Sequence, residues 1–213
     1  MTPIESSKKA KEICLLAPVV PVLVVKQAAS AKALAEALVA GGLPALEVTL
    51  RTPEALEAIA EMASVPGGVV GAGTLLTPQD VQNAVDAGAL FGVSPGATDR
   101  LLDAAMEAGL PMLAGAATAT EAMRLLERGF TVQKFFPAEA AGGAPALKSL
   151  ASPLPQIQFC PTGGVSLANA ASYLSLPNTL CVGGSWVAPA GMVENGDWAG
   201  IKALAKEAAA LPR

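Results

Sequence analysis

The feature that most restricts how this chain can fold is a regular alternation of two kinds of segment along its 213 residues. Short apolar runs rich in Val and Leu alternate with longer stretches rich in Ala, Leu and Glu. The short runs have the composition of parallel strands buried on both faces, and the longer stretches have the length and pattern of helices. Eight strand–helix units in a chain of this length predict an α/β protein, specifically a (β/α)8 TIM barrel.

The eight strands are predicted at residues 19–25, 45–50, 69–75, 90–94, 111–116, 132–136, 156–160 and 180–183. Helices are predicted at 31–40, 53–63, 78–87, 99–108, 120–128 and 167–174, with an extra N-terminal helix at 6–16 and a last one at 198–210. Thr77 and Thr118 stand where N-caps are needed, and Gly88, Gly109 and Gly129 stand where helices should stop. No linker or change of composition interrupts residues 1–213, so we expect a single domain.

An open, doubly wound sheet is the alternative architecture for the same alternation. Its dinucleotide fingerprint is incomplete here, because the segment from Gly71 to Gly73 lacks the third glycine and the acidic partner. The barrel is therefore the favoured fold.

Composition excludes several classes of function. The net charge of −4 argues against a nucleic-acid partner, which would require a basic patch. No apolar stretch reaches the roughly 18 residues of a membrane span, and residues 1–11 do not resemble a secretory signal, so we expect a cytoplasmic protein. Cys14, Cys160 and Cys181 lack metal-ligand spacing and are expected to be small buried thiols.

The chain contains no histidine. Ser-His-Asp and Cys-His nucleophiles are therefore excluded, as are zinc sites that use histidine ligands. Any acid–base chemistry must use Glu, Asp, Lys, Tyr or water.

Lys134 is the first candidate for a functional residue, because it lies in an apolar segment predicted to be a buried strand, residues 131–137. Desolvation of an ammonium group is costly, which favours the neutral amine that attacks carbonyl groups. From this segment alone, a lysine whose stem packs on Phe135 or Phe136 while its amine reaches solvent is the alternative. Lys26, at the end of the first strand, is a second candidate amine.

The second predicted strand carries alternating polar side chains. Glu47, Thr49 and Arg51 share one face, and Leu46 and Val48 share the other. If the apolar face packs on the outer helices, a carboxylate and a guanidinium enter the barrel near its mouth, where they suit proton transfer and carboxylate binding. A structural ion pair is the alternative. By the same alternation, five side chains are predicted to point into one space: Glu47, Arg51, Thr74, Lys134 and Thr162.

Two glycine pairs follow the last two strands, Gly163-Gly164 and Gly183-Gly184, and Ser185 follows the second pair. These are the loops with which barrels often bind phosphate through backbone amides. No Asp, Glu, Lys or Arg occurs between Ser149 and Val193, so a phosphate would be held by amides and Ser185. Tight turns are the alternative explanation for each pair taken singly.

Seven segments, in order along nearly the whole chain, resemble the class I 2-keto-3-deoxy-6-phosphogluconate (KDPG) aldolases. They are Pro18–Lys26, Leu46–Thr52, Val70–Thr74, Ser94–Gly96, Lys134–Glu139, Phe159–Gly164 and Cys181–Trp186. The resemblance implies a homotrimeric (β/α)8 enzyme without metal or cofactor. Its partner would be a small phosphorylated 2-keto acid: it would cleave KDPG to pyruvate and glyceraldehyde 3-phosphate and, as family members often do, also 4-hydroxy-2-oxoglutarate (KHG) to pyruvate and glyoxylate.

The resemblance also implies roles for individual residues. Lys134 matches the Schiff-base lysine, and Glu47 matches the acid/base carboxylate. The positions around the pyruvate portion are Arg51, Thr74, Pro95 and Phe136, and those toward the hydroxyl and phosphate end are Thr162, Gly163, Gly164, Gly184 and Ser185. Two other functions stay open: another Schiff-base barrel, such as one that binds pyridoxal phosphate, and a phosphosugar-binding barrel without activity.

Overall fold

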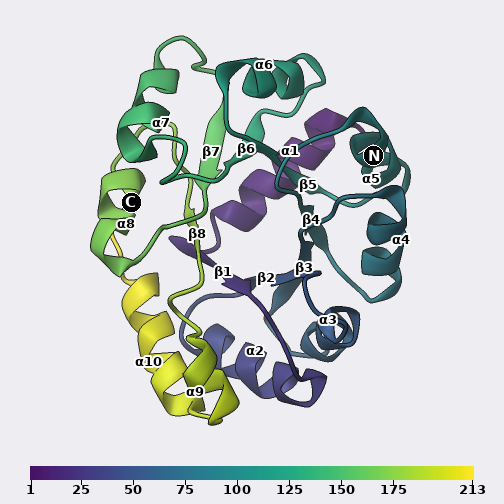
Figure 1. Ribbon diagram of the computed structural model, residues 1–213, viewed down its shortest axis with the longest axis vertical. Coiled ribbons are helices and arrows are strands. Elements are labelled where there is room, and N and C mark those ends of the chain that lie inside the picture. Colours follow the sequence, from purple (N-terminus) through teal and green to yellow (C-terminus); the bar gives the residue numbers. More distant parts are fainter.

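A ring of eight parallel strands surrounded by helices forms the protein in a computed structural model that describes residues 1–213 (Figure 1). The strands are β1 (Val19–Leu23), β2 (Ala45–Thr49), β3 (Val69–Gly73), β4 (Phe91–Val93), β5 (Met112–Ala116), β6 (Val132–Phe135), β7 (Gln158–Pro161) and β8 (Val182–Gly184). The predicted (β/α)8 barrel is confirmed, and all eight predicted strands are present with ends shifted by up to two residues.

The strands are hydrogen-bonded in the order β7-β6-β5-β4-β3-β2-β1-β8. The seam between β7 and β8 is closed by two isolated parallel bridges, one between Phe159 and Thr179 and one between Thr162 and Gly183. The amide of Leu180 donates to the carbonyl of Phe159 at 2.9 Å across this seam. The ring is therefore closed, and the two glycine-containing strand ends are neighbours.

Ten helices and one 3₁₀ turn connect the strands: α1 (Pro3–Cys14), α2 (Ala31–Ala40), α3 (Ala55–Ala63), α4 (Pro78–Asp86), α5 (Asp99–Glu107), α6 (Ala119–Glu127), α7 (Gly143–Ala151), α8 (Leu167–Leu174), α9 (Ala190–Glu194), α10 (Trp198–Ala209) and η1 (Ala28–Ser30). The predicted extra N-terminal helix is confirmed as α1. It begins earlier than expected because Thr2 caps it in a capping box with Glu5. None of the helices combines the length and apolar character that crossing a membrane demands.

The predicted helix ends are observed. Thr77 and Thr118 are N-caps whose hydroxyl oxygens accept from backbone amides at 3.2 and 3.3 Å. Gly88, Gly109 and Gly129 have φ values of +90°, +72° and +93°, which only glycine adopts without strain. These local signals mark the ends of α4, α5 and α6.

Two apolar cores hold the barrel together. The larger lies between strands and helices and contains Leu46 and Val48. The smaller lies inside the ring and contains residues such as Phe91 and Val93, the three free cysteines and Ala10 of α1. The predicted outward direction of Leu46 and Val48 is therefore confirmed, and the cysteines are buried as expected.

Helix α1 lies across the N-terminal end of the strands (Figure 1). The hydroxyl oxygen of Ser6 accepts from the amide of Met112 at the start of β5, at 2.9 Å. The hydroxyl oxygen of Ser7 accepts from the amide of Thr131, just before β6, at 3.0 Å. With this end closed by α1, only the C-terminal end of the ring is open, which is where barrels place their chemistry.

Candidate active site

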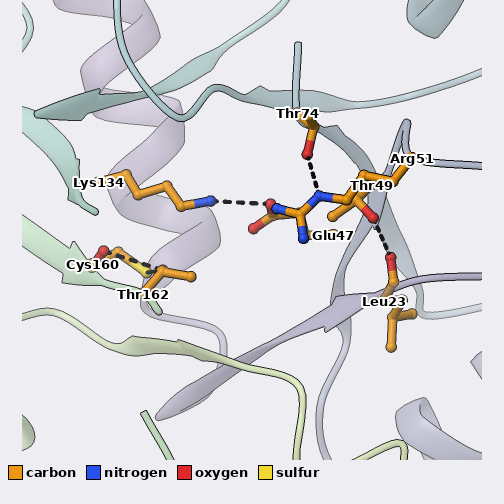
Figure 2. A network of polar contacts seen from close by, with 8 residues as sticks. All are labelled: Leu23, Glu47, Thr49, Arg51, Thr74, Lys134, Cys160 and Thr162. Atoms are coloured by element: carbon orange, nitrogen blue, oxygen red, sulfur yellow. Dashed lines mark hydrogen bonds and ion pairs between the residues drawn. The ribbon is translucent and has the colours of Figure 1, made fainter. Parts of the chain in front are cut away.

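Lys134 and Glu47 form a buried ion pair inside the C-terminal half of the barrel. The amine Nζ of Lys134 lies 3.2 Å from Oε1 of Glu47, and the two residues are only 4 % and 2 % exposed. They come from β6 and β2, which face each other across the ring, and Figure 2 shows their side chains pointing toward one another. The convergence expected from strand alternation is therefore observed.

The sequence around Glu47 makes room for its carboxylate. Gly73 of β3 is the hydrogen-bonded neighbour of Thr49 in the register, and a Cβ at Gly73 would overlap Oε1 of Glu47. On the same face of β2, the hydroxyl of Thr49 donates to the carbonyl of Leu23 at 2.9 Å. Strand β2, which carries the carboxylate, is thus fixed to β1. The carboxylate occupies space that any side chain at position 73 would fill.

This pair can perform acid–base and nucleophilic chemistry. A carboxylate in direct contact with an ammonium group can take its proton, which leaves the neutral amine that attacks a carbonyl carbon. The ring of Phe136 lies 5.1 Å from Nζ and forms an apolar wall beside it. An amine, a base and an apolar wall together are what imine formation with a ketone needs.

Arg51 stands above the pair at the mouth of the barrel. Its Nε donates to the hydroxyl oxygen of Thr74 at 3.1 Å, and its terminal nitrogens make no hydrogen bond with the protein (Figure 2). Both terminal nitrogens can therefore bind a carboxylate in the bidentate manner typical of arginine. Thr74 has a φ of +63°, and it is the only residue other than glycine with a positive φ.

The two glycine pairs border a cavity of about 180 Å³ that opens next to Lys134. Gly163 and Gly164 have φ values of +101° and +77°. A Cβ at Gly183 would overlap the side chain of Thr162, and one at Gly184 would overlap the ring of Trp186. The absence of side chains at these four positions therefore allows the two loops to approach the cavity with their backbones.

A match to a protein-family model covers residues 10–204, and the description of that family is "KDPG and KHG aldolase". The chain belongs to this family. The family resemblance of the sequence is thereby confirmed.

A relative found by sequence and two solved structures agree with this assignment. The chain is 50 % identical to the KHG/KDPG aldolase of Escherichia coli over 200 residues, 93 % of this chain and 94 % of the relative. The crystal structure of the KDPG aldolase of Zymomonas mobilis with 3-phosphoglycerate matches with a TM-score of 0.93 and 53 % identity, over 97 % of this chain and 98 % of that one. The crystal structure of the Legionella pneumophila KDPG aldolase, captured with pyruvate as a covalent carbinolamine, matches with a TM-score of 0.91 and 44 % identity. The match covers 94 % of this chain and 98 % of that one.

Most of the predicted site residues of this aldolase line the cavity beside Lys134. They are Arg51, Lys134, Phe136, Thr162, Gly163, Gly164, Gly184 and Ser185. Glu47 and Thr74 adjoin the cavity through their contacts with Lys134 and Arg51. A larger cavity of about 360 Å³ between α5 and α6 contains none of the predicted residues, so residue chemistry rather than volume identifies the site.

Two expected candidates lie apart from the cavity, and three lining residues were not predicted. Pro95 is partly buried with its carbonyl against Gly115 and does not line the cavity. Lys26, the rival amine, is exposed and forms an ion pair with Glu194 at 3.0 Å. The lining residues that were not predicted are Val22, Val24 and Val165, whereas Gly183, also in the lining, belongs to the second predicted glycine pair. For Val22 and Val24 the signal was their place at the end of the first strand.

Proposed function

We propose that this aldolase works through a Schiff base on Lys134 and cleaves KDPG to pyruvate and glyceraldehyde 3-phosphate, and that it also cleaves KHG to pyruvate and glyoxylate. The observation that carries the proposal is the buried contact of the Lys134 amine with the Glu47 carboxylate at 3.2 Å. It is a nucleophile with its own base, in a chain that otherwise has neither histidine nor another buried lysine.

The reaction starts when the neutral amine of Lys134 attacks the C2 ketone and water is lost. The resulting iminium withdraws electrons from the C3–C4 bond. Glu47, directly or through a water, then removes the proton of the C4 hydroxyl, so that the bond breaks to an enamine and an aldehyde. Protonation of the enamine at C3 and hydrolysis of the imine release pyruvate and return Lys134 to its starting state.

The two ends of the substrate have separate binding groups. Arg51 binds the carboxylate of the pyruvate portion, next to Thr74 and the wall formed by Phe136. Thr162 faces the hydroxyl groups of the substrate, between its two ends. The phosphate is bound by the amides of the two glycine loops and by Ser185. A structural relative that carries 3-phosphoglycerate and one that carries a covalent pyruvate adduct support both halves of this assignment.

The proposed reaction needs no metal and no cofactor, because the iminium supplies the electron sink that either would otherwise provide. The two rival functions make different predictions for Lys134. A pyridoxal-phosphate enzyme would hold its cofactor on this lysine and show a visible absorbance. A phosphosugar-binding barrel would bind substrate without releasing pyruvate.

The homotrimeric state and the cytoplasmic location stay predictions from the sequence.

Borohydride trapping with pyruvate tests the proposal. Reduction of the imine should attach the three-carbon unit to Lys134, which peptide mass mapping locates. Lys134→Ala should lose the adduct and, in a coupled assay of pyruvate release from KDPG, essentially all activity. Lys26→Ala is the matched control, because it removes an exposed lysine near the mouth of the barrel. This variant should keep both the pyruvate adduct and the activity on KDPG. A trapped adduct that survives in Lys134→Ala would disprove the mechanism.

A further inference from the structure

The connection between β7 and α8 is held from its outer side by a row of hydrogen bonds. Its three successive carbonyl oxygens all accept: Thr162 from the amide of Ala138 at 2.8 Å, Gly163 from the amide of Glu139 at 3.0 Å, and Gly164 from Nδ2 of Asn169 at 3.1 Å. All three donors lie outside the cavity lining. The peptide planes of this loop are therefore fixed in one direction.

The amides of the same loop are left for another partner. The N–H groups of Gly163, Gly164 and Val165 donate to no group of the protein, although these residues line the cavity beside Lys134. Successive unpaired amides around glycines with positive φ form a concave site that attracts anions. Because the carbonyls are held outward, the amides are directed to the cavity.

Asn169 has two functions in this arrangement. Its Oδ1 accepts from the amide of Ser166 at 2.8 Å and so completes the N-terminal cap of α8. Its Nδ2 is the only donor to the carbonyl of Gly164. One side chain therefore links the first turn of α8 to the peptide plane that orients the next amide, that of Val165.

Glu139 supports the same loop from the other side. A Cβ at Gly164 would lie 2.6 Å from Cγ of Glu139, so the two residues are in close contact. The carboxylate of Glu139 accepts a hydrogen bond from the hydroxyl of Tyr173, a fully buried residue of α8. Burial, and then this carboxylate, raise the pKa of Tyr173, so its hydroxyl stays protonated and donates at neutral pH.

We propose that Asn169 and Glu139 are positioning residues that orient the amides of residues 163–165 toward the phosphate of the substrate, and that they thereby determine the preference for phosphorylated over unphosphorylated 2-keto acids. The inference rests on the proposed function, since it assigns the phosphate to this loop. Neither side chain lines the cavity, so each acts through the backbone it holds. Removing this support should affect the binding of phosphate and leave the chemistry at Lys134 as it is.

Asn169→Asp removes the donor but adds a negative charge, so it is measured beside Tyr173→Phe, which adds none. The aspartate keeps the size of the side chain and the oxygen that caps α8, as Asp80 does in the matching position of α4, where it accepts from the amide of Thr77 at 2.9 Å. It loses the donor to Gly164. Asn83→Asp, the same change on α4 at the other side of the ring, is the control (Figure 1).

For Asn169→Asp we expect KM for KDPG to rise by roughly 10- to 100-fold, because a misplacement of about 1 Å can cost up to about a hundredfold, with kcat little changed. KM for KHG, which has no phosphate, and pyruvate trapping on Lys134 should match the wild type. Tyr173→Phe, which keeps the ring and removes the donor to Glu139, should shift KM for KDPG in the same direction. An unchanged KM for KDPG in Asn169→Asp, or equal losses on both substrates, would overturn the inference.

Calorimetric titration with inorganic phosphate tests the inference without turnover, so it separates this inference from the proposed reaction. The wild type and Asn83→Asp should bind phosphate equally, and Asn169→Asp should bind it about tenfold more weakly or worse. Equal affinity in all three proteins, or no phosphate binding by the wild type, would contradict the inference whatever the fate of the aldolase reaction. Failure of pyruvate trapping in the wild type would contradict the proposed function alone.

Discussion

Thr74 combines an unfavourable backbone conformation with a contact to Arg51. Its φ of +63° is in the left-handed region, which costs a residue with a Cβ about 1–2 kcal/mol, and a β-branched residue is rare there. Its hydroxyl oxygen accepts from Nε of Arg51 at 3.1 Å. Strained residues of this kind persist where the surroundings hold them, often at sites of binding.

Two substitutions separate the strain from the contact. Thr74→Ala removes the hydroxyl and keeps a Cβ in the strained conformation, and Thr74→Gly removes both. We expect both to raise KM for the keto acid, because Arg51 loses its partner. In urea unfolding, Thr74→Gly should be more stable than Thr74→Ala by about 1 kcal/mol, after allowing for the greater freedom of glycine in the unfolded chain. Equal stability after the same allowance would show that the conformation carries no strain.

At the residue scale, the sequence was sufficient for side chains that follow strand alternation. Lys134 and Glu47 share a space because β6 and β2 are opposite strands of an eight-membered ring, and alternation sets which face each residue occupies. The supporting bonds of Asn169 and Glu139 could not be found in this way. They depend on which backbone carbonyls face outward in a loop, and the glycine pairs predict the loop but not the direction of its carbonyls.

At the element scale, most helices were predicted within about two residues, whereas α1 begins three residues earlier than predicted and α7 and α9 were not predicted. Helix α2 and helix α8 have the predicted bounds. Helix α7 begins at Gly143, follows an N-cap glycine, Gly142, and has Pro145 in its first turn, and these residues indicate a turn by themselves. Proline is tolerated there because the amides of a first turn have no helical partner. Helix α9 has five residues, too few for a periodic pattern.

Helix α6 illustrates how an end signal contributes to stability. The amides of Ala117 and Thr118 donate to the carboxylate of Glu121 at 2.8 and 2.9 Å. These bonds, that of Ala117 first, lower the pKa of Glu121. Because the pKa is lower in the folded protein, the carboxylate stabilises the fold above its ordinary pKa of about 4.3, and this contribution is lost as the pH falls through the lowered value.

Glu121→Gln should therefore lower the free energy of unfolding by about 0.3–1 kcal/mol at pH 7, and the difference from the wild type should disappear in acid below the lowered pKa. Glu127→Gln, at the opposite end of the same helix, is the control. It removes a negative charge from the end where the helix dipole disfavours one, so it should be neutral or slightly stabilising at pH 7. Urea unfolding between pH 7 and pH 3 measures both. If Glu121→Gln lowered the free energy of unfolding by the same amount at every pH, the charge of Glu121 would be ruled out as the cause.

At the scale of the whole molecule, the number of strand–helix units was enough to predict the barrel, but not how its last seam closes. Strands β7 and β8 meet through isolated bridges, which follow from the geometry of the complete ring. The ring separates two tasks along its axis. Lys134, Glu47 and Arg51 occupy the C-terminal half, whereas α1 closes the N-terminal end. This division is typical of TIM barrels, in which the face opposite the active site contributes to stability.

Ser6 tests that separation. It is fully buried, and its hydroxyl oxygen is the partner of the Met112 amide at the start of β5. Ser6→Ala leaves this amide unpaired in the interior, so it should lower the free energy of unfolding by about 1–3 kcal/mol. Ser64→Ala is the control, because Ser64 is exposed at the end of α3 and should change stability by less than about 0.5 kcal/mol.

Under conditions where both variants are folded, pyruvate trapping on Lys134 and kcat for KDPG should equal those of the wild type. The reason is that the bond lost in Ser6→Ala lies at the closed end of the barrel, where no group of the proposed site is located. A loss of kcat in the folded Ser6→Ala protein would mean that α1 also controls the geometry of Lys134 and Glu47 through the inner core. The two ends of the barrel would then form one unit rather than two.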